Sequence, residues 1–143
     1  MAKQKVLFVC TGNSARSQMA EAFARAYGKG KVAAQSAGME PRGLHPFAVE
    51  VMREKGIDIS QQQSKMFSED LARTMDTVIT VCGNAEERCP LLPPRVRHLN
   101  WPLDDPARAT GSREEIREVF RSSRDEIERL VREFLAWVEA PTE

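Results

Sequence analysis

The stretch that decides the fold is KVLFVC, residues 5–10, followed directly by TGNSARS, residues 11–17. After its lysine, the first part is an unbroken run of β-branched, aromatic and other apolar residues, which predicts a buried strand. Gly12 and Asn13 favour a tight turn at its end, because both residue types tolerate left-handed backbone geometry. Residues 17–27 are rich in helix formers. The stretch therefore predicts a strand, a tight loop and a helix in immediate succession.

Strand and helix signals continue to alternate along the rest of the chain. Further strands are predicted at residues 32–37, 77–82 and 96–101, and further helices at 46–56, at 68–74 and over the C-terminal region that starts at Ser112. Alternating strands and helices are typical of a parallel sheet covered on both faces. We therefore expect a single three-layer α/β/α domain over residues 1–143, built on a central four-stranded parallel sheet.

The C-terminal helix has the clearest pattern. Ser112 with Glu115 is a capping-box pair, in which each side chain bonds the backbone N–H of the other residue. Apolar residues then recur at helical spacing and form one stripe suited to covering a sheet: Ile116, Val119, Phe120, Ile127, Leu130, Val131, Phe134, Leu135 and Val138.

The composition excludes several classes of protein. The chain has 21 Lys and Arg against 21 Asp and Glu, so it lacks the basic surplus of a nucleic-acid-binding protein. The longest apolar run, residues 6–10, is far shorter than the about 18 residues of a membrane span, and it is too short for the core of a signal peptide. Three cysteines, an odd number, cannot form a complete disulfide framework. We expect a monomeric, cytoplasmic protein that binds no membrane.

The loop between the first strand and the first helix has the composition of an anion site. A helix N-terminus presents unsatisfied N–H groups and a partial positive charge to a tetrahedral oxyanion. Arg16 supplies a planar fork that matches two oxyanion oxygens, and the same field would stabilise a Cys10 thiolate. Ser14 and Ser17 offer hydroxyl donors. The plainer alternative is a buried cysteine at a strand end, followed by an ordinary helix cap.

The loop is similar to the signature of thioredoxin-coupled arsenate reductases, which share their fold with low-molecular-weight protein tyrosine phosphatases. The shared residues are Cys10-Thr11-Gly12-Asn13-Ser14, Arg16-Ser17-Gln18-Met19-Ala20-Glu21, Ser36-Ala37-Gly38, Gly56-Ile57-Asp58-Ile59-Ser60, Val81-Cys82-Gly83, Cys89-Pro90, Pro93-Pro94, Asp104-Asp105-Pro106-Ala107-Arg108-Ala109 and Arg124-Asp125-Glu126-Ile127. The resemblance covers nearly the whole chain. It implies a low-molecular-weight phosphatase-like fold and arsenate reduction in arsenic detoxification.

The resemblance also implies which residues act. Cys10 would attack arsenate, Cys82 would attack Cys10 as arsenite leaves, and Cys89 would attack Cys82. Reduced thioredoxin would then reduce the Cys82–Cys89 disulfide, with no bound metal or other cofactor. The family's general acid corresponds to Asp105 rather than to its neighbour Asp104. The other implied residues are Ser17, which assists the nucleophile, and those that bind arsenate or its phosphate and sulfate analogues: Thr11, Gly12, Asn13, Ser14, Ala15 and Arg16.

Without the resemblance, the two later cysteines leave several interpretations open. Cys82 and Cys89 are seven residues apart, which is not a C-x-x-C spacing, and only His45 and His98 would join them at a zinc site. Either cysteine alone is explained as well by a buried or loop position. A helical segment would separate the two by about 10 Å, whereas a disulfide needs Cα atoms within about 7 Å. We therefore expect residues 83–88 to rearrange when the two cysteines are oxidised.

Two positions depart from the family's pattern. Relatives can carry a potassium site at residues that match Asn13, Glu21, Ser36 and an aspartate. This chain has Lys65 in place of that aspartate, which predicts poor potassium binding, equal activity in potassium and sodium, and a Lys65 ammonium close to Glu21. Ala15 stands where the related families usually have a second loop cysteine, which leaves the resolving role more plainly to Cys82.

Two other functions stay open on the sequence. A tyrosine phosphatase would use the same loop, with Cys10, Arg16, Ser17 and Asp105, on phosphate esters. Weak phosphatase activity fits beside arsenate reduction, because phosphate and arsenate are alike in shape and charge. Against a dedicated phosphatase, Pro106 precedes Ala107-Arg108 and not the aromatic pair that would line a tyrosyl pocket. A non-catalytic oxyanion or redox sensor would need tight anion binding without turnover, and the composition does not favour it.

Overall fold

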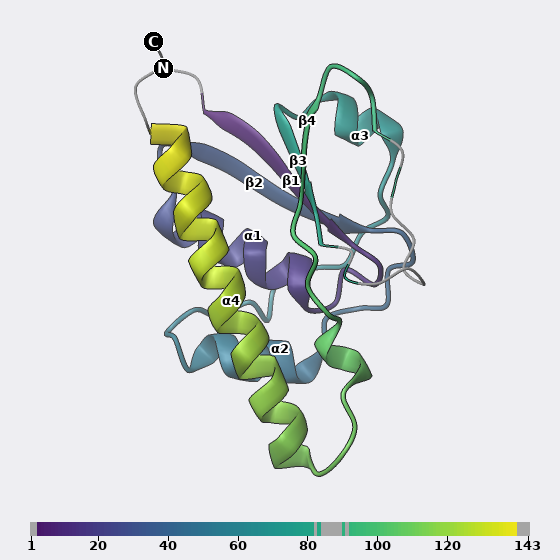
Figure 1. The fold of residues 1–143 in the computed structure, drawn as a ribbon, viewed down its shortest axis with the longest axis vertical. Coiled ribbons are helices and arrows are strands. Elements are labelled where there is room, and N and C mark those ends of the chain that lie inside the picture. The colour runs from purple at the N-terminus through teal and green to yellow at the C-terminus, as the bar shows by residue number, and fades with distance from the viewer. Residues whose placement is uncertain (1–2, 82, 84–89, 91, 140–143) are drawn as a thin grey trace.

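The computed structural model describes residues 3–81, 83, 90 and 92–139, which form a central sheet with helices on both faces (Figure 1). The elements are β1 (Gln4–Cys10), α1 (Arg16–Tyr27), β2 (Val32–Gly38), α2 (Pro46–Arg53), α3 (Glu69–Arg73), β3 (Thr77–Thr80), β4 (Arg97–Asn100), the 3-10 turn η1 (Pro106–Arg108) and α4 (Arg113–Glu139). The strand order is β2-β1-β3-β4, and all three strand pairs are parallel. The predicted four-stranded parallel sheet is confirmed.

The side chains of β1 alternate between two cores. Val6 and Phe8 pack with residues of α1, α2 and α4 in the larger core, whereas Leu7 and Val9 pack on the opposite face with residues of α3 and its surroundings. All four side chains are fully buried. Figure 1 shows this division, with α1, α2 and α4 on one side of the sheet and α3 on the other. A strand buried on both faces has no polar side, which explains the unbroken apolar run in the sequence.

The central position of β1 surrounds its carboxyl end with other elements. Cys10 pairs with Gly38 at the end of β2. On the other side, the Val81 N–H donates to the Val9 carbonyl just beyond the end of β3 (2.8 Å). Ligands of open α/β sheets bind beyond the carboxyl ends of the strands. The fold therefore places Cys10 at the edge of the sheet where a ligand site is expected.

Some predicted boundaries differ from those in the structure. The predicted helix at residues 46–56 ends as α2 at Arg53, and the chain then turns through Gly56, whose φ of 78° is left-handed. β3 stops at Thr80 instead of continuing to residue 82, and Cys82 lies outside the described residues. The turn η1 has no counterpart among the predicted elements, because three residues are too few to show a helical pattern.

The start of α4 agrees with the prediction. The Ser112 N–H donates to Glu115 Oε1, and the Glu115 N–H donates to Ser112 Oγ, both at 3.1 Å. The helix continues for 27 residues, and its apolar stripe packs into the larger core through buried residues such as Phe120, Ile127 and Val131. The capping box and the apolar stripe are therefore both confirmed.

A cluster of charges joins α2 to α4. The Glu54 carboxylate, directly after α2, accepts hydrogen bonds from Arg121 (2.8 Å from Nη2 to Oε2) and from Arg124 (2.8 Å from Nη1 to Oε1). Arg124 also donates to the Val51 carbonyl inside α2 (2.9 Å). The hydrogen bond from Arg121, followed by that from Arg124, lowers the pKa of Glu54 from 4.5 to about 2.

Replacing Glu54 should change how the stability of the fold depends on pH. A carboxylate whose folded-state pKa is depressed stabilises the protein above its ordinary pKa and loses that effect as the pH falls through the folded-state value. Glu54→Gln should therefore be less stable than the parent at neutral pH, and the difference should shrink as the pH falls from 4.5 towards 2. Urea unfolding at a series of pH values measures it. Glu133→Gln, an exposed partner of Arg129 on α4, is the control. A constant difference across the pH range would contradict the prediction.

Candidate active site

The loop of residues 11–15 leads from β1 into α1, which begins at Arg16, one residue before the predicted start. Ala15 is the N-cap residue, and no side chain caps the helix there. The first-turn N–H groups and the positive end of the helix dipole are thus directed at the loop without a competing side-chain acceptor. An oxyanion in the loop would take the place that a capping side chain occupies in other helices.

Cys10 lies at the base of this loop and is 2% exposed. Its Sγ is 2.9 Å from Ser17 Oγ, and the Asn13 N–H donates to the same sulfur at 3.2 Å. The sulfur therefore has a hydroxyl and a backbone N–H beside it at the N-terminus of α1, and the thiolate is the form in which a cysteine reacts.

Asn13 holds the loop in shape. Its φ of 47° is left-handed, as predicted for this position, whereas Gly12 does not share that geometry. The Asn13 side chain accepts from the Lys65 N–H (2.9 Å) and donates to Ser17 Oγ (2.7 Å). Its carbonyl accepts from Gln18 Nε2 (2.9 Å) and Ser64 Oγ (2.6 Å). Each of these bonds resists rotation of the strained residue, so the amide stays directed at Cys10.

The backbone carbonyls of the loop accept hydrogen bonds on the outer side of the loop. The segment of residues 39–45 runs beside the loop, and its N–H groups donate to the carbonyls of Cys10, Thr11, Gly12 and Ser14 at 2.8–3.2 Å. Gly38 makes this approach possible, because a Cβ there would lie 2.7 Å from the Cβ of Asn13. These carbonyl dipoles are therefore satisfied by residues 39–45 and do not repel an anion in the loop.

Arg16 and Asp105 meet beside the loop. Arg16 is 1% exposed, and its Nη1 donates to the carbonyls of Val81 (2.7 Å) and Leu103 (2.9 Å). Its Nη2 lies 3.7 Å from Asp105 Oδ2, and the Asp105 side chain keeps 13% of its surface exposed. Asp105 Oδ1 also accepts from the Ala107 N–H (3.0 Å), so the same carboxylate begins η1. One Asp105 carboxylate therefore begins the turn and also lies beside the Arg16 guanidinium.

His45 lies next to the site. The sequence pointed to it only weakly, as a zinc ligand. Its N–H donates to the Ser14 carbonyl (2.9 Å), and its Nδ1 accepts from the Phe47 N–H (3.1 Å) at the start of α2. The ring packs on Phe120 with 4.6 Å between centroids. Burial lowers the pKa of His45, against the opposing charge of Asp105. The imidazole is therefore neutral near pH 7, as its acceptor role requires.

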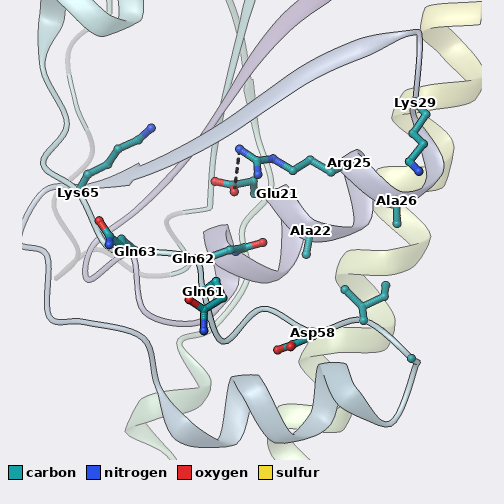
Figure 2. Close-up of a pocket in the computed structure, with 12 residues that line it drawn as sticks. Glu21, Ala22, Arg25, Ala26, Lys29, Asp58, Gln61, Gln62, Gln63 and Lys65 are labelled. Carbon is teal, nitrogen blue, oxygen red and sulfur yellow. Dashed lines mark ion pairs between the residues drawn. The ribbon is translucent and has the colours of Figure 1, made fainter.

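The predicted position of Lys65 is wrong. The Lys65 ammonium donates to Gln35 Oε1 at 2.6 Å, on β2, and not to Glu21. Glu21 Oε1 accepts from the Ser36 hydroxyl (2.8 Å), and Glu21 Oε2 lies 3.3 Å from Arg25 Nη2. Figure 2 shows this ion pair as a dashed line, with Lys65 apart from it. The spacing of Glu21 and Arg25, four residues apart on one helix, is the signal from which the pair could have been predicted.

Two of the candidate residues, Cys82 and Cys89, lie outside the described part of the chain. Within that part, no group of three or more His, Cys, Asp or Glu side chains could hold a metal ion. None of the helices there combines the length and the apolarity that crossing a bilayer requires.

Comparison with known proteins agrees with this geometry. The family model described as low molecular weight phosphotyrosine protein phosphatase matches residues 5–142. The chain belongs to this family. Its relatives include an arsenate reductase of Shouchella clausii, which is 48% identical over 134 residues that cover 94% of this chain and 96% of that protein. The chain therefore also belongs with the arsenate reductases, and the predicted family is confirmed.

Solved structures show the same fold. An arsenate reductase in the phosphate binding state has a TM-score of 0.78 and 38% identity, and the match covers 95% of this chain and 99% of that one. A thioredoxin-dependent arsenate reductase of Corynebacterium glutamicum has a TM-score of 0.74 and 32% identity, over 96% of this chain and 62% of that one. The predicted low-molecular-weight phosphatase-like fold is confirmed.

Ser17→Ala tests the environment of the Cys10 sulfur. A hydrogen bond to a charged group contributes about 1.5–3 kcal/mol, so alkylation of Cys10 by iodoacetamide should slow by about tenfold or more. Mass spectrometry of the Cys10 peptide follows the reaction without interference from other thiols. Ser123→Ala is the matched control, because the buried Ser123 Oγ has no hydrogen-bond partner within the described structure. Equal alkylation rates in the two variants would contradict the assigned role of Ser17.

Proposed function

We propose that this chain reduces arsenate to arsenite, with Cys10 as the nucleophile and Cys82 and Cys89 as resolving thiols. One observation carries the proposal: the Cys10 sulfur lies at a helix N-terminus, 2.9 Å from Ser17 Oγ and 3.2 Å from the Asn13 amide nitrogen. Its relatives are arsenate reductases, which supports arsenate as the substrate. The presence of two further cysteines in the chain supports reduction over simple hydrolysis.

The first step forms a bond between sulfur and arsenic. Arsenate occupies the loop of residues 11–16, where backbone N–H groups and the Arg16 guanidinium neutralise its charge. The Cys10 thiolate attacks arsenic, and one arsenic–oxygen bond breaks. Asp105 donates a proton to the departing oxygen, which leaves as water. Arsenic keeps its oxidation state in this step.

The redox steps follow by exchange between thiols and disulfides. The Cys82 thiolate attacks Cys10 Sγ and forms a Cys10–Cys82 disulfide, while the electron pair of the broken sulfur–arsenic bond stays on arsenic and arsenite departs. The Cys89 thiolate then attacks Cys82 Sγ and releases Cys10. Reduced thioredoxin supplies the two electrons that reopen the Cys82–Cys89 disulfide, a donor supported by the thioredoxin-dependent relative.

The setting of this chemistry is also proposed. Free thiols that cycle through a disulfide need a reducing compartment, which favours the cytoplasm. We also propose that the chain acts as a single domain over residues 1–143 and as a monomer, since one chain supplies Cys10, Arg16 and Asp105 to the site.

Phosphate-ester hydrolysis at the same loop is the second candidate, favoured by the description of the family model. It needs Cys10, Arg16 and Asp105 but no further thiol. The residues after Pro106 speak against a dedicated tyrosine phosphatase, since Ala107 and Arg108 are exposed in η1 and neither provides an aromatic wall.

Cysteine variants distinguish the two functions. With arsenate, thioredoxin, its reductase and a nicotinamide donor, we expect Cys10→Ser, Cys82→Ser and Cys89→Ser each to abolish multiple turnover. Cys89→Ser should still release one arsenite per chain, because the Cys10–Cys82 disulfide can form. Hydrolysis of p-nitrophenyl phosphate should be lost only in Cys10→Ser. Continued turnover of arsenate by Cys82→Ser would contradict the relay, and no turnover of either substrate by the parent would favour a sensor.

Asp105→Asn tests the proton donor. Asparagine keeps the oxygen that accepts the Ala107 N–H, so η1 should persist, but it cannot donate the proton. General acid catalysis contributes about 10²–10⁴-fold, and a loss in this range is expected in the single-turnover rate of arsenite release. Asp104→Asn is the adjacent control and should react like the parent. An unchanged rate for Asp105→Asn would remove this residue from the mechanism.

A further inference from the structure

Glu21 is a carboxylate in the interior, on the side of α1 that faces β2. Its side chain is only 8% exposed. A buried charge is costly unless a partner compensates it. The Ser36 hydroxyl donates to Oε1 at 2.8 Å but brings no charge. The compensating charge must come from another group.

Arg25 provides that charge from the next turn of α1. Its Nη2 lies 3.3 Å from Glu21 Oε2, and its Nε donates to the Ala34 carbonyl on β2 at 3.2 Å. One guanidinium therefore gathers a carboxylate oxygen and a backbone carbonyl oxygen, which are the donor types that hard metal cations take in proteins. The guanidinium thus brings to Glu21 the positive charge that the Ser36 hydroxyl lacks.

The potassium site implied by the family resemblance does not fit these contacts. Asn13 Oδ1 accepts from the Lys65 N–H, the Ser36 hydroxyl donates to Glu21, and the second Glu21 oxygen faces Arg25. The three side chains named for the site thus have other partners. Lys65 replaces the fourth and directs its ammonium to Gln35.

We infer that the Arg25 guanidinium is the cation that pairs with Glu21, in place of a metal ion from solution. The same guanidinium links α1 to the edge strand β2. Figure 2 shows Arg25 reaching across to Glu21 in the wall of a cavity of about 790 Å³ that is also lined by Gln62 and Lys65. Gln62 donates to Gln18 (2.7 Å), whose amide donates to the Asn13 carbonyl, so the same wall supports the catalytic loop.

Thermal unfolding tests the inference independently of arsenate reduction. The unfolding temperatures can be interpreted even if the chain proves not to reduce arsenate. Four proteins are compared: the parent, Arg25→Ala, Arg73→Ala, and the double variant Glu21→Gln/Arg25→Ala. Arg73→Ala is a matched control, because Arg73 also pairs with a glutamate four residues away at 3.3 Å and is likewise 58% exposed, but its partner Glu69 is 63% exposed. Each protein is measured in potassium, in sodium and with low-millimolar guanidinium, at equal ionic strength.

We expect Arg25→Ala to unfold several degrees below the parent and Arg73→Ala to unfold close to it. Low-millimolar guanidinium should recover part of the loss in Arg25→Ala alone, and Glu21→Gln in the same background should also recover part of it. The parent should unfold at the same temperature in potassium and sodium. A higher unfolding temperature of the parent in potassium, equal losses for the two arginine variants, or no recovery by guanidinium would overturn the inference. Recovery by Glu21→Gln separates the effect of charge from lost packing of the arginine stem.

Discussion

Asn13 in its left-handed conformation is the constraint on which the site depends. Its φ of 47° is compensated by hydrogen bonds from every polar group that it has, and its amide is thereby held on the Cys10 sulfur. These partners come from α1 and from the segment around Lys65, far apart in the sequence. The loop is preorganised because elements packed for other reasons hold one strained residue in place.

Charged side chains in the interior are likewise held by specific neighbouring groups. The chain has no net charge, and the buried charged side chains of its described residues each have a specific partner. Arg16 is fixed by two backbone carbonyls and faces Asp105, while Glu21 faces Arg25. The two neutral carbonyls fix the orientation of the Arg16 guanidinium beside the loop, and the Asp105 carboxylate, 3.7 Å away, is its charged partner. The field at Cys10 therefore arises from a few fixed groups and not from a basic surface.

Local patterns predicted much of the fold and of the site. The apolar run of β1, the turn at Asn13 and the capping box of α4 each depend on neighbours in the sequence, and each agrees with the structure. The support of Asn13 by Ser64 and the position of Lys65 were missed or mistaken, because these contacts join residues 30 to 52 positions apart. Spacing along the chain carries no information on such distances.

The sequence by itself determined the succession of strands and helices along the chain, the parallel sheet and the turn after β1, since hydrophobic periodicity and turn chemistry are properties of short segments. Only the tertiary structure decided which side chains meet. It placed Asp105 beside Arg16, the Lys65 amide on Asn13, and Arg25 rather than Lys65 on Glu21. The physical reason is that a charged or polar side chain binds whichever partner the packed backbones bring within a few ångströms, and that packing is a property of the whole chain.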